Sequence, residues 1–227
     1  MDKLLEYCKK RYDEELGFKF SLSNIYSWIF FVLCINIGSA DPSPDIYRGL
    51  KDMKVKSLID MTEGVIPSLA IADLLASVAF VISLAWLSRK LSEGLFFLFT
   101  LKSDFQLLII DITIIYHGFK YDEAKRKAFG LDAKAEIDRN QKKARRIRSL
   151  GEVFLAMSLG ILFALSFTWT NILISLASAI AFLIATWRSF SFFISSILPY
   201  YVAIKYSNGE LLQIKEAYLK NLSTDQL

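Results

Sequence analysis

Two acidic residues and one basic residue interrupt apolar stretches of this sequence, and they are the first candidates for chemistry. Asp73 is the only charged residue between positions 64 and 88, Asp111 lies inside a second apolar run, and Arg188 follows a third. Because an ionised side chain in hydrocarbon is costly, an intramembrane carboxylate is by default a hypothesis of function, such as an ion path. The alternatives for Asp73 are a pair with Arg188 or Lys102, or exposure to a shallow water-filled cavity. Arg188 is expected to extend its charge to the membrane surface.

A basic run directly before an apolar stretch is the second candidate site. Five of seven consecutive residues are basic, namely Lys142, Lys143, Arg145, Arg146 and Arg148. Near an anionic membrane surface such residues contribute about 1 kcal/mol each, and they hold the segment in the cytoplasm. The run therefore predicts binding of membrane lipid. An acidic partner protein or nucleic acid is the alternative, with nucleic acid less expected because a basic run at this place is what orients a membrane helix.

Small residues form a possible packing surface. Ala156, Gly160 and Ala164 are four residues apart and therefore share one face of a helix. If the chain turns tightly near position 169, antiparallel pairing brings Ala164 level with Ser175 and Gly160 level with Ala179. Small residues let membrane helices approach closely, so this stripe predicts a close hairpin or an oligomer interface. The alternative is an ordinary content of small residues.

Glu152 follows Ser149 by three residues, which is the spacing of a capping box. An acidic residue is also favourable at the positive end of a helix. The pair therefore predicts a helix that begins at the cytoplasmic interface near residue 149.

Other site classes have little support in the sequence. His117 is the only histidine, so a metal site with several histidines is excluded, and two cysteines, Cys8 and Cys34, are too few for a disulfide framework. We find no glycine-rich phosphate loop, no paired catalytic carboxylates and no nucleophile triad. The expectation is a protein that is not an enzyme and has no cofactor or metal.

Long charge-free stretches decide the fold class. Of the 227 residues, 54% are hydrophobic, and no charge occurs in residues 21–40 or 153–187. Stretches of about 18 or more apolar residues are transmembrane candidates. The sequence thus predicts an all-α, polytopic helical membrane protein with about four transmembrane helices. Gly38-Ser39-Ala40 resembles a signal-peptide cleavage site, but the charge-balanced leader before it favours a retained span.

The predicted organisation has four parts. Residues 1–118 are an N-terminal membrane half, with spans at about 21–40 and 65–88 and an interfacial or re-entrant segment at 94–118. Residues 119–149 are a basic cytoplasmic helical linker, with eleven Lys or Arg against five acidic residues. Residues 150–204 are a transmembrane hairpin with an extension, in which 189–204 extends the last helix, lies in the interface or forms a fifth span. Residues 205–227 are a cytoplasmic tail.

The distribution of basic residues favours both termini inside. With four spans, 21 of the 27 Lys and Arg residues face the cytoplasm, whereas a crossing by residues 94–118 lowers that number to 18. The first function hypothesis is a non-enzymatic subunit of the plasma or inner membrane, for example in a signalling or defence complex. It would form a homo-oligomer and use the linker to bind anionic lipid or a cytoplasmic partner protein. The alternative is a small ion channel, pore or ion-coupled transporter with Asp73 and Asp111 along its path.

Overall fold

The computed structural model describes residues 10–11, 22–40, 44–54, 60, 64–67, 69–100 and 123–208. These residues contain helices and no strand. Four helices are long and apolar enough to cross a membrane, at Leu22–Ala40, Ile71–Leu95, Lys127–Ala164 and Trp169–Lys205. The predicted fold class, an all-α polytopic membrane protein, is confirmed.

The chain divides into two compact units. The first, here called the spanning unit, consists of Phe18–Leu91 and Ile147–Trp187. The second, here called the basic unit, consists of Met1–Gly17, Ser92–Arg146 and Arg188–Leu227.

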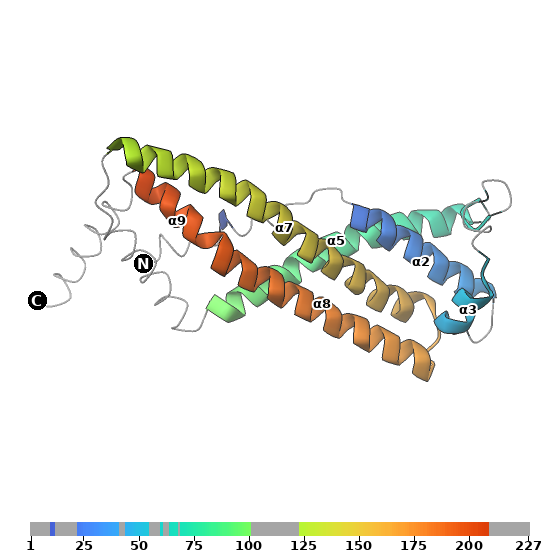
Figure 1. Cartoon of the computed structure of the whole chain (residues 1–227). Coiled ribbons are helices and arrows are strands. Elements are labelled where there is room, and N and C mark those ends of the chain that lie inside the picture. Colours follow the sequence, from blue (N-terminus) through green and yellow to red (C-terminus); the bar gives the residue numbers. More distant parts are fainter. Residues whose placement is uncertain are drawn as a thin grey trace, which may run out of the picture. The chain divides into compact units, whose positions relative to one another are not determined.

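The spanning unit is a bundle of four helices with a short helix in one connection (Figure 1). It contains α2 (Leu22–Ala40), α3 (Ile46–Asp52), the start of α5 (Ile71–Thr100), the end of α7 (Glu123–Ala164) and the start of α8 (Trp169–Ser196). Figure 1 shows that α2 and α7 run in one direction and that α5 and α8 run in the other. Successive spans therefore alternate in direction, as consecutive membrane crossings do.

Aromatic and hydroxyl side chains join α2 to α5 inside this bundle. The rings of Phe31 and Phe80 are stacked, with centroids 3.8 Å apart. The indole Nε1 of Trp28 donates to Ser77 Oγ over 2.8 Å, and Ser77 Oγ in turn donates to the carbonyl oxygen of Leu74. The half-buried indole N–H of Trp28 thus has a partner, as every polar group in a membrane interior requires.

The second span begins later and its helix ends later than the sequence predicts. Residues 64–67 form a turn, in which the Ile66 carbonyl accepts from Leu69 N–H, and α5 starts at Ile71 rather than at residue 65. The helix then continues to Thr100. Residues 94–100, predicted as interfacial or re-entrant, are thus part of α5, and the rest of that segment lies outside the described residues.

The linker and the third span are one helix. α7 runs without interruption from Glu123 to Ala164, so the predicted boundary near residue 149 is not a helix end. The capping box at Ser149 and Glu152 is therefore wrong, because its amide groups already belong to an uninterrupted helix. Within α7, Gly130 lies close to Ser207, so a side chain at position 130 would require the Ser207 side chain to move.

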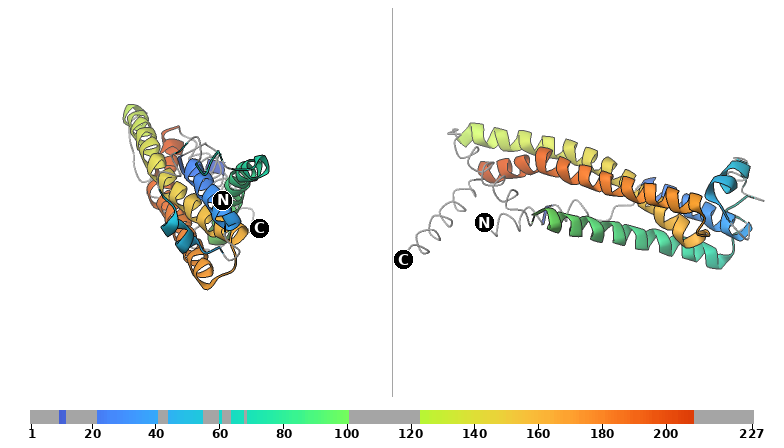
Figure 2. Two further views of the ribbon diagram at one scale, coloured as in Figure 1. Left: turned by 90° about the vertical axis from the view of Figure 1, so that its right-hand side faces the viewer. Right: turned by 90° about the horizontal axis from the view of Figure 1, so that it is seen from below.

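The basic unit has its own apolar core. α8 continues through Arg188 to Ser196, and α9 (Leu198–Ser207) follows with Pro199 in its first turn, an allowed position for proline. Figure 2 shows α9 and the end of α8 beside the first part of α7. Buried side chains from these helices pack together: Ile137, Phe190, Phe193, Ile197, Leu198 and Tyr201. Of the three alternatives for 189–204, the structure has the helical extension, and its apolar residues pack against the linker.

Candidate functional site

A buried asparagine organises one end of the spanning unit. Asn171, in the first turn of α8, is 2% exposed. Its Nδ2 donates to the carbonyl oxygens of Pro44 and Ser166 over 2.9 and 2.8 Å, and its Oδ1 accepts from Ile46 N–H over 3.0 Å. One amide side chain therefore ties the connection after α2 to the turn between α7 and α8. The sequence analysis expected a tight turn near position 169 but assigned no role to Asn171.

Asp45 extends this cluster to the surface. It is the N-cap of α3 and accepts from the backbone N–H groups of Tyr47 and Arg48, while Thr170 Oγ1 donates to its other oxygen. The Thr170 hydroxyl, helped by the two backbone N–H groups, lowers the pKa of Asp45 below its ordinary value. Thr170 is 125 residues from Asp45 in the sequence, so this hydrogen bond, like those of Asn171, joins the two loops. The cluster therefore has a structural role.

A second polar cluster lies where α2 begins. Arg148 Nε is 3.3 Å from Glu152 Oε1 one turn further along α7, with 19% and 13% of the two side chains exposed. The other oxygen of Glu152 accepts from Ser23 Oγ on α2 over 3.1 Å. Glu152 therefore connects α7 with the start of α2. Arg148, predicted as part of the lipid-binding run, lies in this half-buried ion pair.

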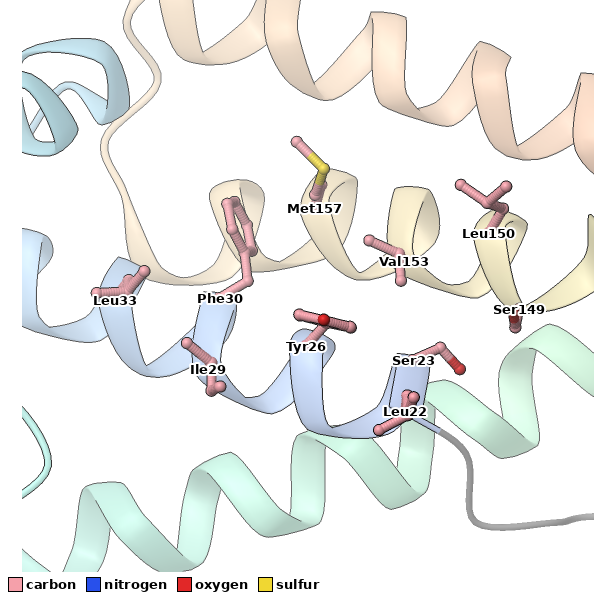
Figure 3. Close-up of a pocket in the computed structure, with 10 residues that line it drawn as sticks. All are labelled: Leu22, Ser23, Tyr26, Ile29, Phe30, Leu33, Ser149, Leu150, Val153 and Met157. Carbon is pink, nitrogen blue, oxygen red and sulfur yellow. The ribbon is translucent and has the colours of Figure 1, made fainter. Parts of the chain in front are cut away.

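An apolar groove of about 520 Å³ separates α2 from α7 beside this second cluster. One wall is a stripe at every fourth residue of α2, Leu22, Tyr26 and Phe30, and the other is the matching stripe of α7, Ser149, Val153 and Met157. Figure 3 shows Ser23 and Ser149 at the same end of the groove and Leu33 at the opposite end. The groove thus has one polar end and one apolar end. Nothing in the sequence patterns considered above predicts it.

The remaining basic residues of the run are on the surface of the basic unit. Lys142, Lys143, Arg145 and Arg146 are all exposed on α7, and we call these four the basic stretch. Lys143 Nζ lies 5.1 Å from the ring centroid of Phe192 on α8, within cation–π range.

Of the three intramembrane charge candidates, Asp73 belongs to the spanning unit and Arg188 to the basic unit. Asp73 is half-buried in the first turn of α5, because that helix begins at Ile71. The sequence analysis expected the span to begin at about residue 65, whereas the observed helix begins six residues later, and Asp73 thus has a position where an acidic side chain stabilises a helix. Arg188 is exposed on α8. Asp111 lies outside the described residues.

The small-residue stripe of α7 packs against α2. A Cβ on Gly160 would lie 3.4–3.5 Å from the rings of Phe30 and Phe31, and Ala164 meets Gly38. In the hairpin itself, Ser158 and Ser175 are hydrogen-bonded at 3.1 Å. The predicted levels, Ala164 with Ser175 and Gly160 with Ala179, are therefore wrong.

The physical reason is the position of the turn. α7 ends at Ala164 and α8 begins at Trp169, so the turn is at 165–168, about three residues before the predicted one. Thr168 caps α8, since its carbonyl accepts from Ile172 N–H and its Oγ1 accepts from Asn171 N–H. When the turn of an antiparallel hairpin lies three residues earlier, the partner of each residue of the second helix lies six positions earlier in the first helix. The hairpin is nevertheless close, because a Cβ on Gly151 would lie 3.2 Å from that of Ala185.

No family model, curated protein or solved structure matches this chain. Within the described residues, no group of three or more His, Cys, Asp or Glu side chains could hold a metal ion. The candidate sites are the basic stretch and the groove between α2 and α7.

Proposed function

We propose that the protein is a non-enzymatic integral membrane subunit whose basic stretch binds anionic lipid headgroups at the cytoplasmic surface. One observation supports this function above the others: the exposed basic stretch lies on α7, which continues as the same helix into the third span. The four positive charges thus directly precede the span along one helix, where a membrane surface is expected.

The length of α7 supports this placement. Its 42 residues correspond to about 63 Å of helix, twice the roughly 30 Å of a bilayer's hydrocarbon core. Residues 150–164 of α7 carry Glu152 as their only charge, whereas charges are frequent between Glu123 and Arg148. The charged half therefore extends beyond the membrane. At about 1 kcal/mol per basic residue, the four charges favour an anionic surface strongly.

The alternating directions of the spans support the proposed sidedness. Within the spanning unit, α5 and α7 run in opposite directions (Figure 1), so the C-terminal end of the α5 part and the N-terminal end of the α7 part lie on one side of this unit. This arrangement agrees with four crossings. The excess of basic residues assigns that side, with both termini, to the cytoplasm of a plasma or inner membrane.

Oligomerisation and a protein partner belong to the same proposal. The span in α5 is the least buried of the four, so much of its apolar surface meets lipid or a second copy of the chain. An acidic cytoplasmic protein would use the same charges as the lipid. The channel alternative has no specific observation in its favour within the described residues, because Asp73 lies at a helix start.

Thermal unfolding in detergent tests the function. Addition of phosphatidylglycerol should raise the unfolding temperature of the wild-type protein more than addition of phosphatidylcholine. The variant Lys142→Gln/Lys143→Gln/Arg145→Gln/Arg146→Gln should lose most of this difference, since it lacks the four charges.

A matched control removes four other positive charges from α7. The variant Lys125→Gln/Lys127→Gln/Lys134→Gln/Arg139→Gln changes the net charge equally but leaves the basic stretch intact. It should keep the preference for phosphatidylglycerol. An equal loss in both variants would mean that only net charge matters, and no loss in the first would refute lipid binding by the basic stretch.

A further inference from the structure

We propose that the groove between α2 and α7 holds one acyl chain of a phospholipid, with the headgroup beside Ser23 and Ser149. The inference rests on the proposed function only for the negative charge of that headgroup. The groove and its polar end belong entirely to the spanning unit.

The shape of the groove follows from two different contacts along the same helix pair. Near their C-terminal ends, α2 and α7 touch with no side chain between them, because Gly38 lies against the main-chain oxygen of Ala164. Near Ser23 the full side chain of Glu152 separates the two helices. The helices therefore diverge toward Ser23, and the facing stripes cannot close the space between them.

The dimensions match one lipid chain. The groove extends from Leu22 to Leu33 on α2, which is about 16 Å of helix. This is close to half of the roughly 30 Å hydrocarbon core, and so to one leaflet. The volume of about 520 Å³ lies within the range of small-molecule sites.

The lining selects an apolar occupant. Phe30, Leu33, Val153 and Met157 offer no hydrogen bond to water, and an apolar space of this kind does not hold ordered water. At the opening of the groove, three lining residues are exposed on the outside of the bundle: Leu22, Tyr26 and Leu150. Entry is therefore sideways from the membrane, where lipid chains are the abundant apolar molecules.

The polar end selects the headgroup. Ser23 and Ser149 supply hydroxyl groups there, and the pair of Arg148 and Glu152 adds one positive and one negative group. Phosphatidylglycerol carries complementary groups, a phosphate for the cation and glycerol hydroxyls for the carboxylate. In the proposed orientation this end lies at the cytoplasmic leaflet, which is where such a headgroup would be.

Lipid retained through purification tests the groove. The full-length protein, washed extensively in mild detergent, should keep roughly one phospholipid per protein molecule, since a groove of this volume holds a single acyl chain. Val153→Trp should lose most of that lipid because the indole occupies the groove. Leu173→Trp, at an exposed position of α8 outside the groove, is the control of equal size and should keep it.

Photocrosslinking of the wild-type protein is a second test that needs no folded variant. Phosphatidylglycerol with a diazirine in its acyl chain should label peptides 22–33 and 149–157 most strongly, and label there should persist longest on dilution into unlabelled lipid. Labelling spread evenly over the spans, or full lipid retention by a folded Val153→Trp variant, would overturn the proposal.

The two proposals fail separately. If Val153→Trp loses its lipid while the variant of the basic stretch keeps its preference for phosphatidylglycerol, the groove stands and the proposed function fails. If the preference is lost but Val153→Trp retains lipid, the groove fails and the proposed function stands.

Discussion

Gly38 on α2 lies directly against the main-chain oxygen of Ala164 at the end of α7. Backbone cannot move aside as a flexible side chain can, so even a methyl group at position 38 would push the two helices apart. Gly38→Ala should therefore lower the free energy of unfolding by about 1–3 kcal/mol, the usual cost of overpacking. Thermal unfolding in detergent measures it.

A second glycine provides the control for this prediction. Gly94 lies in α5 with open space around the position of a Cβ. Gly94→Ala should be neutral or slightly stabilising, because alanine favours a helix by roughly 1 kcal/mol over glycine. Equal effects of the two substitutions would show that α2 and α7 do not touch at Gly38.

The amide side chain of Asn171 should contribute strongly to the stability of the fold. Asn171→Ala removes three hydrogen bonds and leaves the Ile46 N–H without this partner, whereas the Pro44 carbonyl still accepts from the Ser166 hydroxyl. Each unsatisfied buried group costs about 1–3 kcal/mol, so the variant should unfold at a clearly lower temperature. Asn140→Ala, which removes one bond to the Ser196 carbonyl, should have a smaller effect. The reverse order would refute the role of Asn171 in joining the two loops.

Arg148 and Glu152 should be energetically coupled. Because both side chains are mostly buried, Glu152→Gln and Arg148→Gln should each cost about 1.5–3 kcal/mol, and the double variant should cost less than their sum. A double-mutant cycle measures this coupling. Arg139 and Glu136 form an exposed pair at 3.7 Å, and their cycle should give about 0–1 kcal/mol. Similar values for both pairs would contradict the half-buried contact.

Acidification should weaken the loop cluster through Asp45. Its pKa is below the ordinary 3.8, so the folded state binds a proton less readily than the unfolded chain. The stabilisation is complete well above pH 3.8 and is lost as the pH falls through the lowered pKa. Between neutral pH and that region, Asp45→Asn should show a smaller fall in unfolding temperature than the wild type. Parallel pH profiles of the two proteins would exclude this contribution.

The charge-free runs located the spans well but not their ends. The first helix begins at Leu22, within one residue of its prediction, because membrane insertion depends on composition over about 20 residues. Helix ends depend on single hydrogen bonds. The turn in which the Ile66 carbonyl accepts from Leu69 N–H precedes α5, which begins later than predicted and so changes the interpretation of Asp73. The Thr168 cap fixes the start of α8 and so changes the hairpin pairs.

The apolar stretches also did not reveal whether lipid or another part of the protein would contact them. Phe190, Phe193 and Ile197 could have faced lipid, whereas they pack on Ile137 of the charged linker. Likewise, periodicity placed Gly160 on a stripe but could not choose between α8 and α2 as its neighbour. The groove depends on the divergence of two helices far apart in sequence, which no local pattern encodes.

Placement of the basic stretch at the cytoplasmic membrane surface is the central claim, because lipid binding and the headgroup end of the groove both depend on it. Single cysteines in a Cys8→Ser/Cys34→Ala background test it directly with a membrane-impermeant thiol reagent on intact cells. Tyr47→Cys on α3 and Lys134→Cys on α7 are both at exposed positions. We predict labelling at position 47 in intact cells, and at position 134 only after the membrane is permeabilised. Labelling of position 134 but not position 47 in intact cells would contradict the claim.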